Sequence, residues 1–437
     1  MIPAGLSLEQ APPFGVPLRF FLTAPWFLVL AALLILWQGP GIFASRWSPA
    51  TLALTHLLTL GFMAQVMIGA LLQMLPVVVG VVVPRPRLTA ALIHIPLTLG
   101  TLALSAGLWV GLPPVFRLAT WLLGLAFGVA LTAIHIALWR APVASGTVVT
   151  LRCALTGLLA TVGLGLWLSG FFGWGWRLPV LAVANLHAGW GLLGWTVLLV
   201  AGVAYQVVPM FQITPPYPPR FVGAFALLVS GLLVAWSLLL AGGWETAARL
   251  AASGLAVATA SFAGITLYLL AQRRRKIGDA SLNYWRLSLI SLLAAAGLWL
   301  WAQASPARAQ APQIELALGI LMIAGFALGV INGMMYKIVP FLAWFHLQAQ
   351  LFGRIKVPNM KQLLPDAAIR RQWWAYLAAL LLLLAAVLYP SLFSVPAALA
   401  LGVTGAWLGF NLTQVGLAYR RLSRAAEPAP DPSSAGV

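Results

Sequence analysis

Five histidines are the side chains of this sequence with the clearest capacity for chemistry. They are His56, His94, His135, His187 and His346. A neutral imidazole is a strong nitrogen donor to metal ions, and it can also accept or release a proton near neutral pH. There is only one cysteine, Cys153, which excludes metal sites built from thiolate pairs and a fold held together by disulfides. We therefore expect any metal or cofactor site to depend on histidine.

Composition shows the surroundings in which these side chains must work. The chain has 437 residues, of which 62% are hydrophobic and 7% are charged, whereas soluble globular proteins carry about 25% charged residues. Such a chain has too few polar side chains to cover the surface of a water-soluble fold. The sequence therefore predicts an all-α polytopic membrane protein whose surroundings are the lipid bilayer.

Twelve apolar stretches are long enough to cross a hydrocarbon core about 30 Å thick. The predicted helices cover about 20–38, 50–80, 89–111, 116–139, 148–171, 183–211, 221–242, 247–272, 286–305, 313–345, 373–390 and 394–418. We expect one transmembrane domain over 20–418, preceded by a cytoplasmic segment 1–19. The residues 419–437 are rich in Pro, Ala and Ser, and a disordered cytoplasmic tail is expected there.

Basic residues are divided unevenly between the two ends of these helices. Of the 25 basic residues, 19 lie at one end of the helices or in the termini. The other end holds Arg46, Arg117, Arg177, Arg249 and Arg308, and Lys337 lies within a helix. The positive-inside rule then predicts cytoplasmic termini, in a bacterial inner membrane. The same asymmetry explains the net charge of +18, so nothing favours nucleic-acid binding.

One sequence frame occurs three times, in the second, sixth and tenth predicted helices. The copies are GFMAQVMIGALLQMLPV from Gly61, GWTVLLVAGVAYQVVPM from Gly194 and GFALGVINGMMYKIVPF from Gly325. The matched positions are Gly61, Phe62, Gly69, Gln73 and Pro76; Gly194, Trp195, Gly202, Gln206 and Pro209; and Gly325, Phe326, Gly333, Lys337 and Pro340.

This frame predicts three four-helix repeats, about 20–139, 148–272 and 286–418, related by a pseudo-threefold axis normal to the membrane. Glycines would let neighbouring helices approach closely. We expect Gln73, Gln206 and Lys337 to line the interior of the bundle, because a polar group facing lipid is costly. No acid lies within the helices, so snorkelling to the cytoplasmic interface is the favoured arrangement for Lys337.

Twelve helices in three arcs, with a histidine near the outer end of the second helix, resemble subunit I of the haem-copper oxidase and nitric oxide reductase superfamily. The segments LRFFLTAPWFLVLAALLILW and HLLTLGFMAQVMIGALLQMLPVVVG are similar to NnrS-type haem- and copper-binding membrane proteins of the nitric oxide response. The segment GMMYKIVPFLAWFHLQ is similar to uncharacterised members of that wider group. The architectural resemblance covers most of the chain, whereas motif identity is confined to the second, sixth and tenth helices.

The sequence also departs from the catalytic members of that superfamily. The seventh helix, FVGAFALLVSGLLVAWSLLL, lacks the expected histidine pair, and the tenth has no histidine before His346 at its cytoplasmic end. All seven acidic residues fall in loops, helix ends or tails. If the protein is an enzyme, we expect an oxidoreductase, but oxygen reduction coupled to proton pumping is not expected.

The resemblance implies specific roles for two histidines. His56 lies where the superfamily places a ligand of its low-spin haem, and His187 lies on the helix that provides a copper ligand. In the repeat frame His56 corresponds to Gly189, so His187 is offset by two positions, about 200° around a helix. The two imidazoles could face different pores or share one. The competing interpretation of both is a histidine at the membrane interface.

The other histidines have weaker assignments. His94 and His135 fall near the cytoplasmic side of consecutive antiparallel helices, where they would form a second haem or metal pair or bond within the bundle. His346 is expected at the interface. Met63, Met67, Met334 and Met335 offer thioethers that bind Cu(I), although methionine is also common filler in apolar cores.

Two functions therefore remain open. One is a haem b protein, with copper as a further candidate, that handles nitric oxide or redox stress with a redox partner or as a homo-oligomer. The other is a transporter or chaperone for copper, haem or a small solute, with a pore lined by Gln73, Gln206 and Lys337.

Overall fold

The computed structural model describes residues 11–81, 83–141, 145–274, 278–351 and 356–425. Over these ranges the chain is helical, without strands. Twelve helical spans are long and apolar enough to cross a membrane, as the sequence predicts. The spans are Gly15–Phe43, Pro49–Val77, Pro86–Val110, Pro113–Trp139, Gly146–Trp174, Val180–Gln212, Pro219–Ala241, Glu245–Ala271, Ser281–Ala302, Pro312–Leu351, Asp366–Leu388 and Pro390–Arg424.

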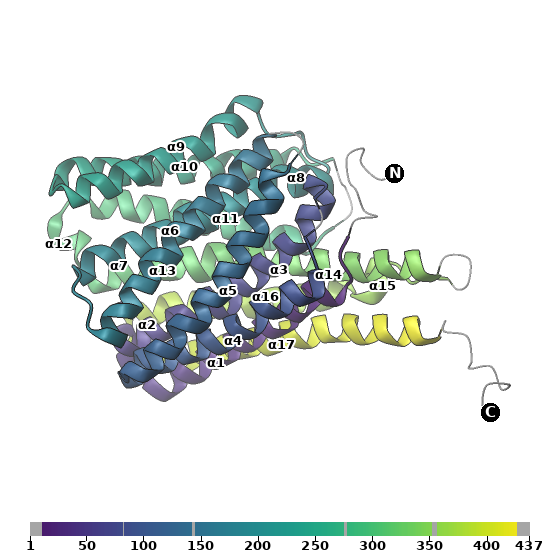
Figure 1. Ribbon diagram of the computed structural model, residues 1–437, viewed down its shortest axis with the longest axis horizontal. Helices are drawn as coiled ribbons and strands as arrows, with labels where there is room; N and C mark the ends of the chain where they lie inside the picture. The colour runs from purple at the N-terminus through teal and green to yellow at the C-terminus, as the bar shows by residue number, and fades with distance from the viewer. Residues whose placement is uncertain (1–10, 82, 142–144, 275–277, 352–355, 426–437) are drawn as a thin grey trace.

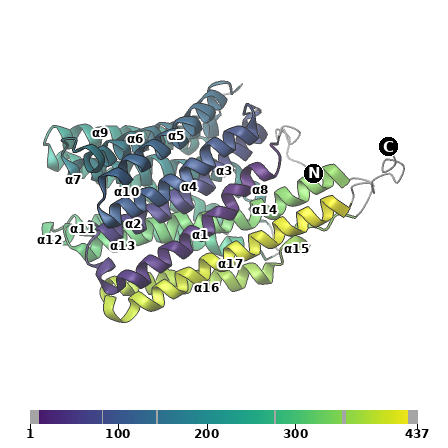
Figure 2. The same cartoon turned by 60° about the horizontal axis from the view of Figure 1, so that its bottom comes forward.

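The spans pack side by side into one bundle (Figure 1). The α-helices are α1 (Gly15–Gln38), α2 (Pro49–His56), α3 (Gln65–Met74), α4 (Pro86–Val110), α5 (Pro113–Trp139), α6 (Gly146–Trp174), α7 (Val180–Gly189), α8 (Leu198–Gln212), α9 (Pro219–Ala241), α10 (Glu245–Ala271), α11 (Ser281–Ala302), α12 (Pro306–Ala309), α13 (Pro312–Ile320), α14 (Leu328–Leu351), α15 (Met360–Leu363), α16 (Asp366–Leu388) and α17 (Pro390–Ala425). The first and last helices, α1 and α17, are neighbours, so the bundle closes on itself (Figure 2).

Local sequence signals explain where several helices begin and end. Ser48 and Ser145 cap α2 and α6, each side chain accepting a bond from a backbone N–H three residues on. Such caps satisfy amides that the first turn of a helix leaves free. At the other ends of α4 and α6, Gly111 and Gly175 adopt φ of 78° and 72°, a left-handed conformation that glycine reaches without steric cost.

The glycines of the threefold frame lie at close helix–helix contacts. Added Cβ atoms would press Gly61 against Phe27 of α1 and Gly325 against Ser291 of α11, and a Cβ added to Gly157 of α6 would lie 2.2 Å from the carbonyl oxygen of Gly194. In each copy the contact is therefore with the helical span that comes before it in the chain. The second glycine of each copy contacts the same preceding helix, which is α1, α6 or α11. These contacts are Gly69 with Phe20, Gly202 with Leu151, and Gly333 with Tyr284.

Each of the same three spans contains a π-helical segment at the frame. The segments are η3 (Leu57–Ala64), η5 (Trp190–Val197) and η6 (Leu321–Ala327). The frame glycine is the fifth residue of every segment. In a π-helical segment the backbone hydrogen bonds span five residues instead of four, so the helix is locally wider. Such segments are frequent at functional sites.

The end of the chain differs from the expectation of a disordered tail after 418. Helix α17 continues to Ala425, because the sequence LAYRRLSRA contains no helix breaker. The remainder of the expected tail, 426–437, lies outside the described residues, as do positions 1–10 of the expected N-terminal segment.

Candidate functional site

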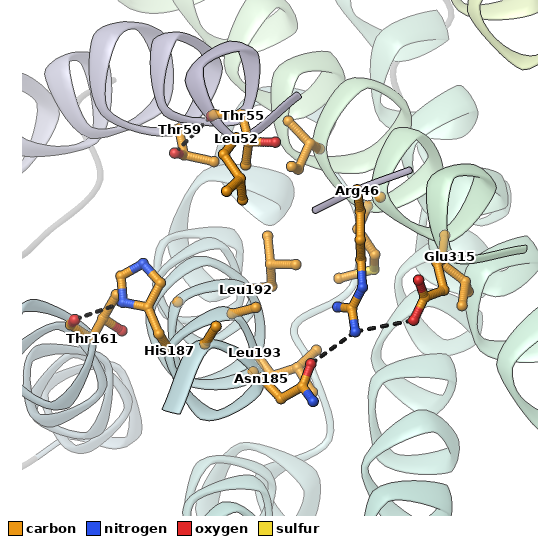
Figure 3. Close-up of a pocket in the computed structure, with 18 of the residues that line it drawn as sticks. Arg46, Leu52, Thr55, Thr59, Thr161, Asn185, His187, Leu192, Leu193 and Glu315 are labelled. Atoms are coloured by element: carbon orange, nitrogen blue, oxygen red, sulfur yellow. Dashed lines mark hydrogen bonds and ion pairs between the residues drawn. The ribbon is translucent and has the colours of Figure 1, made fainter. Parts of the chain in front are cut away.

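A cavity of about 930 Å³ lies in the half of the bundle opposite to the start of α1 and the end of α17. Its wall combines residues from α2 and η3, α5 and α6, α7 and η5, α10 and α11, and α13 and η6. Most of the lining side chains are apolar, and a few polar groups project among them (Figure 3). Cavities of this size and character are the usual binding sites of small molecules and cofactors.

His56 and His187 share this cavity. Their ring centroids are 6.1 Å apart and their planes lie within 21° of parallel. Both residues line the cavity wall and both are half-buried. The structure thus brings together two histidines that the sequence could assign either to one pore or to two.

Backbone carbonyls fix the orientation of both rings. The Nδ1 atom of His56 lies 2.8 Å from the oxygen of Leu52, and that of His187 lies 2.9 Å from the oxygen of Thr161. A carbonyl oxygen only accepts, so each neutral ring carries its proton on Nδ1 and leaves the Nε2 lone pair available. Metal-binding histidines are commonly oriented in this way by a second hydrogen bond.

The local sequence places the two rings. His56 ends α2 directly before η3, and His187 lies in the last turn of α7, before η5. Gly165 on α6 leaves room for the second ring, because a Cβ added there would lie 2.9 Å from Cε1 of His187. The glycine is therefore required by the close approach of the imidazole.

A polar cluster joins three of the segments that surround the cavity. Arg46 donates through Nη2 to Oδ1 of Asn185 at 2.9 Å and forms an ion pair with Glu315 at 3.0 Å. Arg46 precedes α2, Asn185 belongs to α7, and Glu315 lies in the first turn of α13. All three residues line the cavity (Figure 3). Sequence reasoning missed this cluster, although each residue is an isolated polar group near the start of a frame-containing span.

Lys337 requires a correction. Its Nζ atom forms an ion pair with Oδ2 of Asp279 at 2.5 Å, so the expectation that this lysine has no acid to pair with is wrong. Asp279 also accepts bonds from Ser281 and from Gln212 at the end of α8. The acid lies in the connection before α11, and only the tertiary structure brings this connection beneath α14.

The Asp279 carboxyl has a perturbed pKa. Burial alone would raise it, but the Lys337 ammonium and the hydrogen bonds from Lys337 and Ser281 together hold the pKa of Asp279 below its usual range. The carboxyl is therefore charged at neutral pH and joins the end of α8 and the start of α11 to Lys337 within α14.

The two glutamines of the frame have separate surroundings. Gln73 is buried, whereas Gln206 is exposed and donates to Thr147 at 3.3 Å. Neither residue lines the cavity, and nor does Lys337. A common pore lined by all three stays a prediction.

The remaining histidines are engaged elsewhere. Nε2 of His94 lies 2.9 Å from the hydroxyl of Thr23 on α1, and its ring meets Phe20 edge-on. His135 is exposed and stacks on Trp139 one turn away. No contact in the described part of the chain joins these two histidines, so a shared metal site there stays a prediction. His346 packs against Phe14 and Phe345.

The methionines are mostly core residues. Met63 lines the cavity, whereas Met67, Met334 and Met335 are buried in the apolar core. Within the described residues there is no group of three or more His, Cys, Asp or Glu side chains able to hold a metal ion. The cavity wall therefore offers two imidazoles and the thioethers of Met63 and Met322.

Fold and site together define a class: an all-helical, multi-pass membrane protein with a cavity that two oriented histidines share. Comparison with known sequences adds no narrower assignment, since no family model matches the chain and no curated protein matches it.

Proposed function

We propose that this chain is a haem-binding membrane protein that handles nitric oxide or redox stress, related to the NnrS-like branch of the haem-copper oxidase superfamily. The observation that supports this most directly is the arrangement of His56 and His187. Two imidazoles, each oriented through Nδ1, border a single, mainly apolar cavity. A bound haem would supply one-electron redox chemistry that no side chain of this cavity can supply.

The two rings lie close enough to serve one bound group. Their centroids are 6.1 Å apart, and His56 and His187 are the residues that would hold a haem iron in this cavity, through ring nitrogens that suit iron. A two-histidine set also suits haem better than a bare ion, because the porphyrin supplies the other four ligands.

The cavity wall suits the rest of such a molecule. An apolar lining accommodates a macrocycle, and Arg46 and Arg249 place cationic side chains on the same wall, where they would attract carboxylates. Met63 also lies on this wall, and its thioether would be a ligand for copper, since thioethers favour Cu(I).

We further propose that the helices form three pseudo-symmetric repeats as in oxidase subunit I, with both termini in the cytoplasm of a bacterium. The frame glycines support this, because in all three copies they contact the preceding span. The π-helical segments support it too, since they occupy matched positions of the frame. The distribution of basic residues supports the orientation.

A transporter or chaperone for copper, haem or a small solute is the second candidate. It is favoured by ion pairs at opposite ends of the bundle, Arg46 with Glu315 and Lys337 with Asp279. Each pair joins different helical spans, as the gates of an alternating-access protein must do.

A visible absorption spectrum of the detergent-purified protein, with metal analysis, separates the two candidates. The haem proposal predicts a Soret band and a reduced-minus-oxidised α band that both disappear in His56→Ala and His187→Ala. His135→Ala is the matched control, because that imidazole is exposed and away from the cavity. A colourless, metal-free wild type after expression with added haem precursor would overturn the proposal and favour the transporter.

A further inference from the structure

Two arginines lie at the junction of α5 and α6, which pack side by side (Figure 2). Arg152, in the second turn of α6, donates through Nη2 to the carbonyl of Leu138 at 2.8 Å. Its guanidinium also lies over the ring of Trp139, 6.0 Å from the centroid. Arg140 follows Trp139 directly, and both of these side chains are exposed. Two cations and one indole are thus gathered where α5 ends and α6 begins.

No acidic side chain of the neighbouring helices can neutralise these charges. The sequence has no Asp or Glu between Glu9 and Glu245. This stretch contains α5, α6 and the elements that pack most closely on them, which are α4, α7, α8, α9 and η5. The ion pairs among the described residues accordingly involve neither arginine. Arg152 is half-buried, where a charge without a counter-charge is costly, so an anion to balance it must come from the surroundings.

The position of this junction matches the headgroup region of a bilayer. It lies at the ends of two membrane spans, Pro113–Trp139 and Gly146–Trp174, and at the end of the bundle that holds most of the basic residues. Trp139 is 73% exposed, and tryptophan at the end of a span typically lies among lipid headgroups. Arginine is the side chain that binds phosphate oxygens best, through charge-assisted hydrogen bonds.

An exposed, mainly apolar surface continues from the junction along both helices. Arg152, Thr156 and Leu159 are four and three residues apart, so they lie on one face of α6, and Thr156 and Leu159 are exposed. On α5, Ile136 lies one turn before Arg140 and is also exposed. A phospholipid can therefore place an acyl chain on this surface while its phosphate lies beside the guanidinium groups. A free phosphate ion would use only the second of these contacts.

The opposite end of the same two helices is an internal comparison. There Arg117, at the start of α5, donates through Nε to the carbonyl of Gly173 at 2.7 Å, and its guanidinium lies 5.8 Å from the ring centroid of Trp174. Each arginine thus joins the start of its own helix to the end of the other. The Arg117 side chain is exposed, however, whereas that of Arg152 is half-buried. Because an exposed guanidinium keeps more of its hydration, the need for an external anion is greater at Arg152.

We propose that Trp139, Arg140 and Arg152 form a binding site for the phosphate of an anionic phospholipid. The two guanidinium groups bind the phosphate oxygens, the indole lies among the headgroup atoms, and an acyl chain lies over Thr156 and Leu159. A zwitterionic lipid fits less well, because its cationic headgroup would have no acid to pair with beside two arginines. The proposal is independent of what the cavity binds, since none of these residues lines the cavity.

Photo-crosslinking tests the proposal at the level of single peptides. The full chain in detergent is mixed with phosphatidylglycerol that carries a diazirine in its acyl chain, and labelled residues are located by mass spectrometry. We expect label around Ile136 and Leu159, about tenfold more than with phosphatidylcholine that carries the same acyl chains. Unlabelled phosphatidylglycerol should compete for this labelling, whereas inorganic phosphate at the same concentration should not.

The test variant is Arg140→Gln with Arg152→Gln, which removes both cations. Labelling by phosphatidylglycerol should fall about tenfold, to the level of phosphatidylcholine. Arg117→Gln is the matched control, because it breaks the corresponding bond at the other end of α5 and α6, and we expect labelling around Ile136 and Leu159 to stay unchanged. If the double variant does not fold, Arg140→Gln alone, at an exposed position, should lower the labelling about threefold.

Three results would overturn the proposal. Equal labelling by the two lipids would show that only ordinary boundary lipid meets this surface. Unchanged labelling in the folded variant would show that the arginines only join the two helices. Competition by inorganic phosphate as strong as that by phosphatidylglycerol would show a site for a free anion rather than for a lipid.

Discussion

The two ends of the bundle treat their polar side chains differently. At the cavity end, His56 and His187 use one ring nitrogen for a backbone carbonyl and keep the other available beside an open space. At the end with the termini, His94 bonds to Thr23 and Lys337 pairs with Asp279. Polar groups with spare bonding capacity next to a cavity can bind a ligand, whereas groups that satisfy one another mainly hold helices together.

This contrast separates two kinds of mutational effect. Substitutions at the cavity end should change what the protein binds more than how stable it is. Substitutions at the other end should change the free energy of unfolding and leave binding almost intact.

The largest effect is expected for His56→Ala and His187→Ala, because each removes one of the two oriented nitrogen donors. Complete loss of the haem spectrum is predicted for both, with little change in melting temperature of the ligand-free protein. His94→Gln is the comparison from the opposite end and should keep the spectrum. Equal losses in all three variants would show that the two ends do not differ in this way.

Among single changes at the end with the termini, Asp279→Asn should be the most destabilising. It leaves the ammonium of Lys337, whose side chain is 20% exposed, without its counter-charge, at an expected cost of about 2 kcal/mol. Thermal unfolding in detergent measures this. The double variant Asp279→Asn with Lys337→Gln should be less destabilised than the single one, and it also restores the polarity of the repeat frame. Loss of binding in Lys337→Gln would instead assign that residue to a transport path.

The Asp279 pair should also make stability depend on pH. The pKa of the Asp279 carboxyl is lowered in the folded protein. The stabilisation that the charged carboxyl gives the fold is therefore complete above the unfolded carboxyl pKa of about 3.9, and it is lost as the pH falls through the pKa of the folded protein. The melting temperature of the wild type should therefore drop more steeply below pH 4 than that of Asp279→Asn. Parallel pH curves for the two proteins would contradict this.

Gly165→Ala should have an intermediate effect of about 1–2 kcal/mol from overpacking, and it should shift the spectrum by moving the ring of His187. Gly163 lies on the same helix with nothing within 4 Å of an added Cβ. Gly163→Ala is thus a matched control that we expect to be neutral or slightly stabilising. A spectrum unchanged by Gly165→Ala would show that the contact does not position the imidazole.

The smallest effect is expected for Arg46→Gln. The Arg46 and Glu315 side chains are 33% and 22% exposed, so breaking this pair should cost about 0.5–1 kcal/mol. The loss should shrink further at high salt, because ions screen partly exposed charges. A larger cost, independent of salt, would show that the cluster closes the bundle more firmly than its exposure indicates.

Much of the fold was predictable from the sequence, because long apolar stretches have few alternatives in a membrane. All twelve spans were predicted, with ends that differ from the structure by several residues. The differences arise where amphipathic turns continue a helix beyond its apolar part, as in α17, which reaches Ala425. The spacing of the frame glycines also indicated the close contacts that Gly61, Gly194 and Gly325 make.

The site was predictable only as a set of candidates. His56 and His187 were identified by residue type, but they are 131 residues apart in the chain, and their offset in the frame left open whether they meet. The π-helical segments and the room beside Gly165 influence where the rings point, and neither can be read from apolar periodicity. His94 and His135 lie on consecutive helices, yet no described contact joins them.

Composition and periodicity by themselves determined that the described part of the chain forms twelve helices long and apolar enough to cross a membrane, because burial of apolar surface and satisfaction of backbone hydrogen bonds allow little else in lipid. Which polar groups meet was decided by the tertiary structure. Arg46 with Glu315, Lys337 with Asp279, and His56 with His187 are each joined across different helical spans. Such pairings depend on helix rotation and loop position, to which the apolar pattern is insensitive, since a helix turned in the membrane exposes much the same hydrophobic surface.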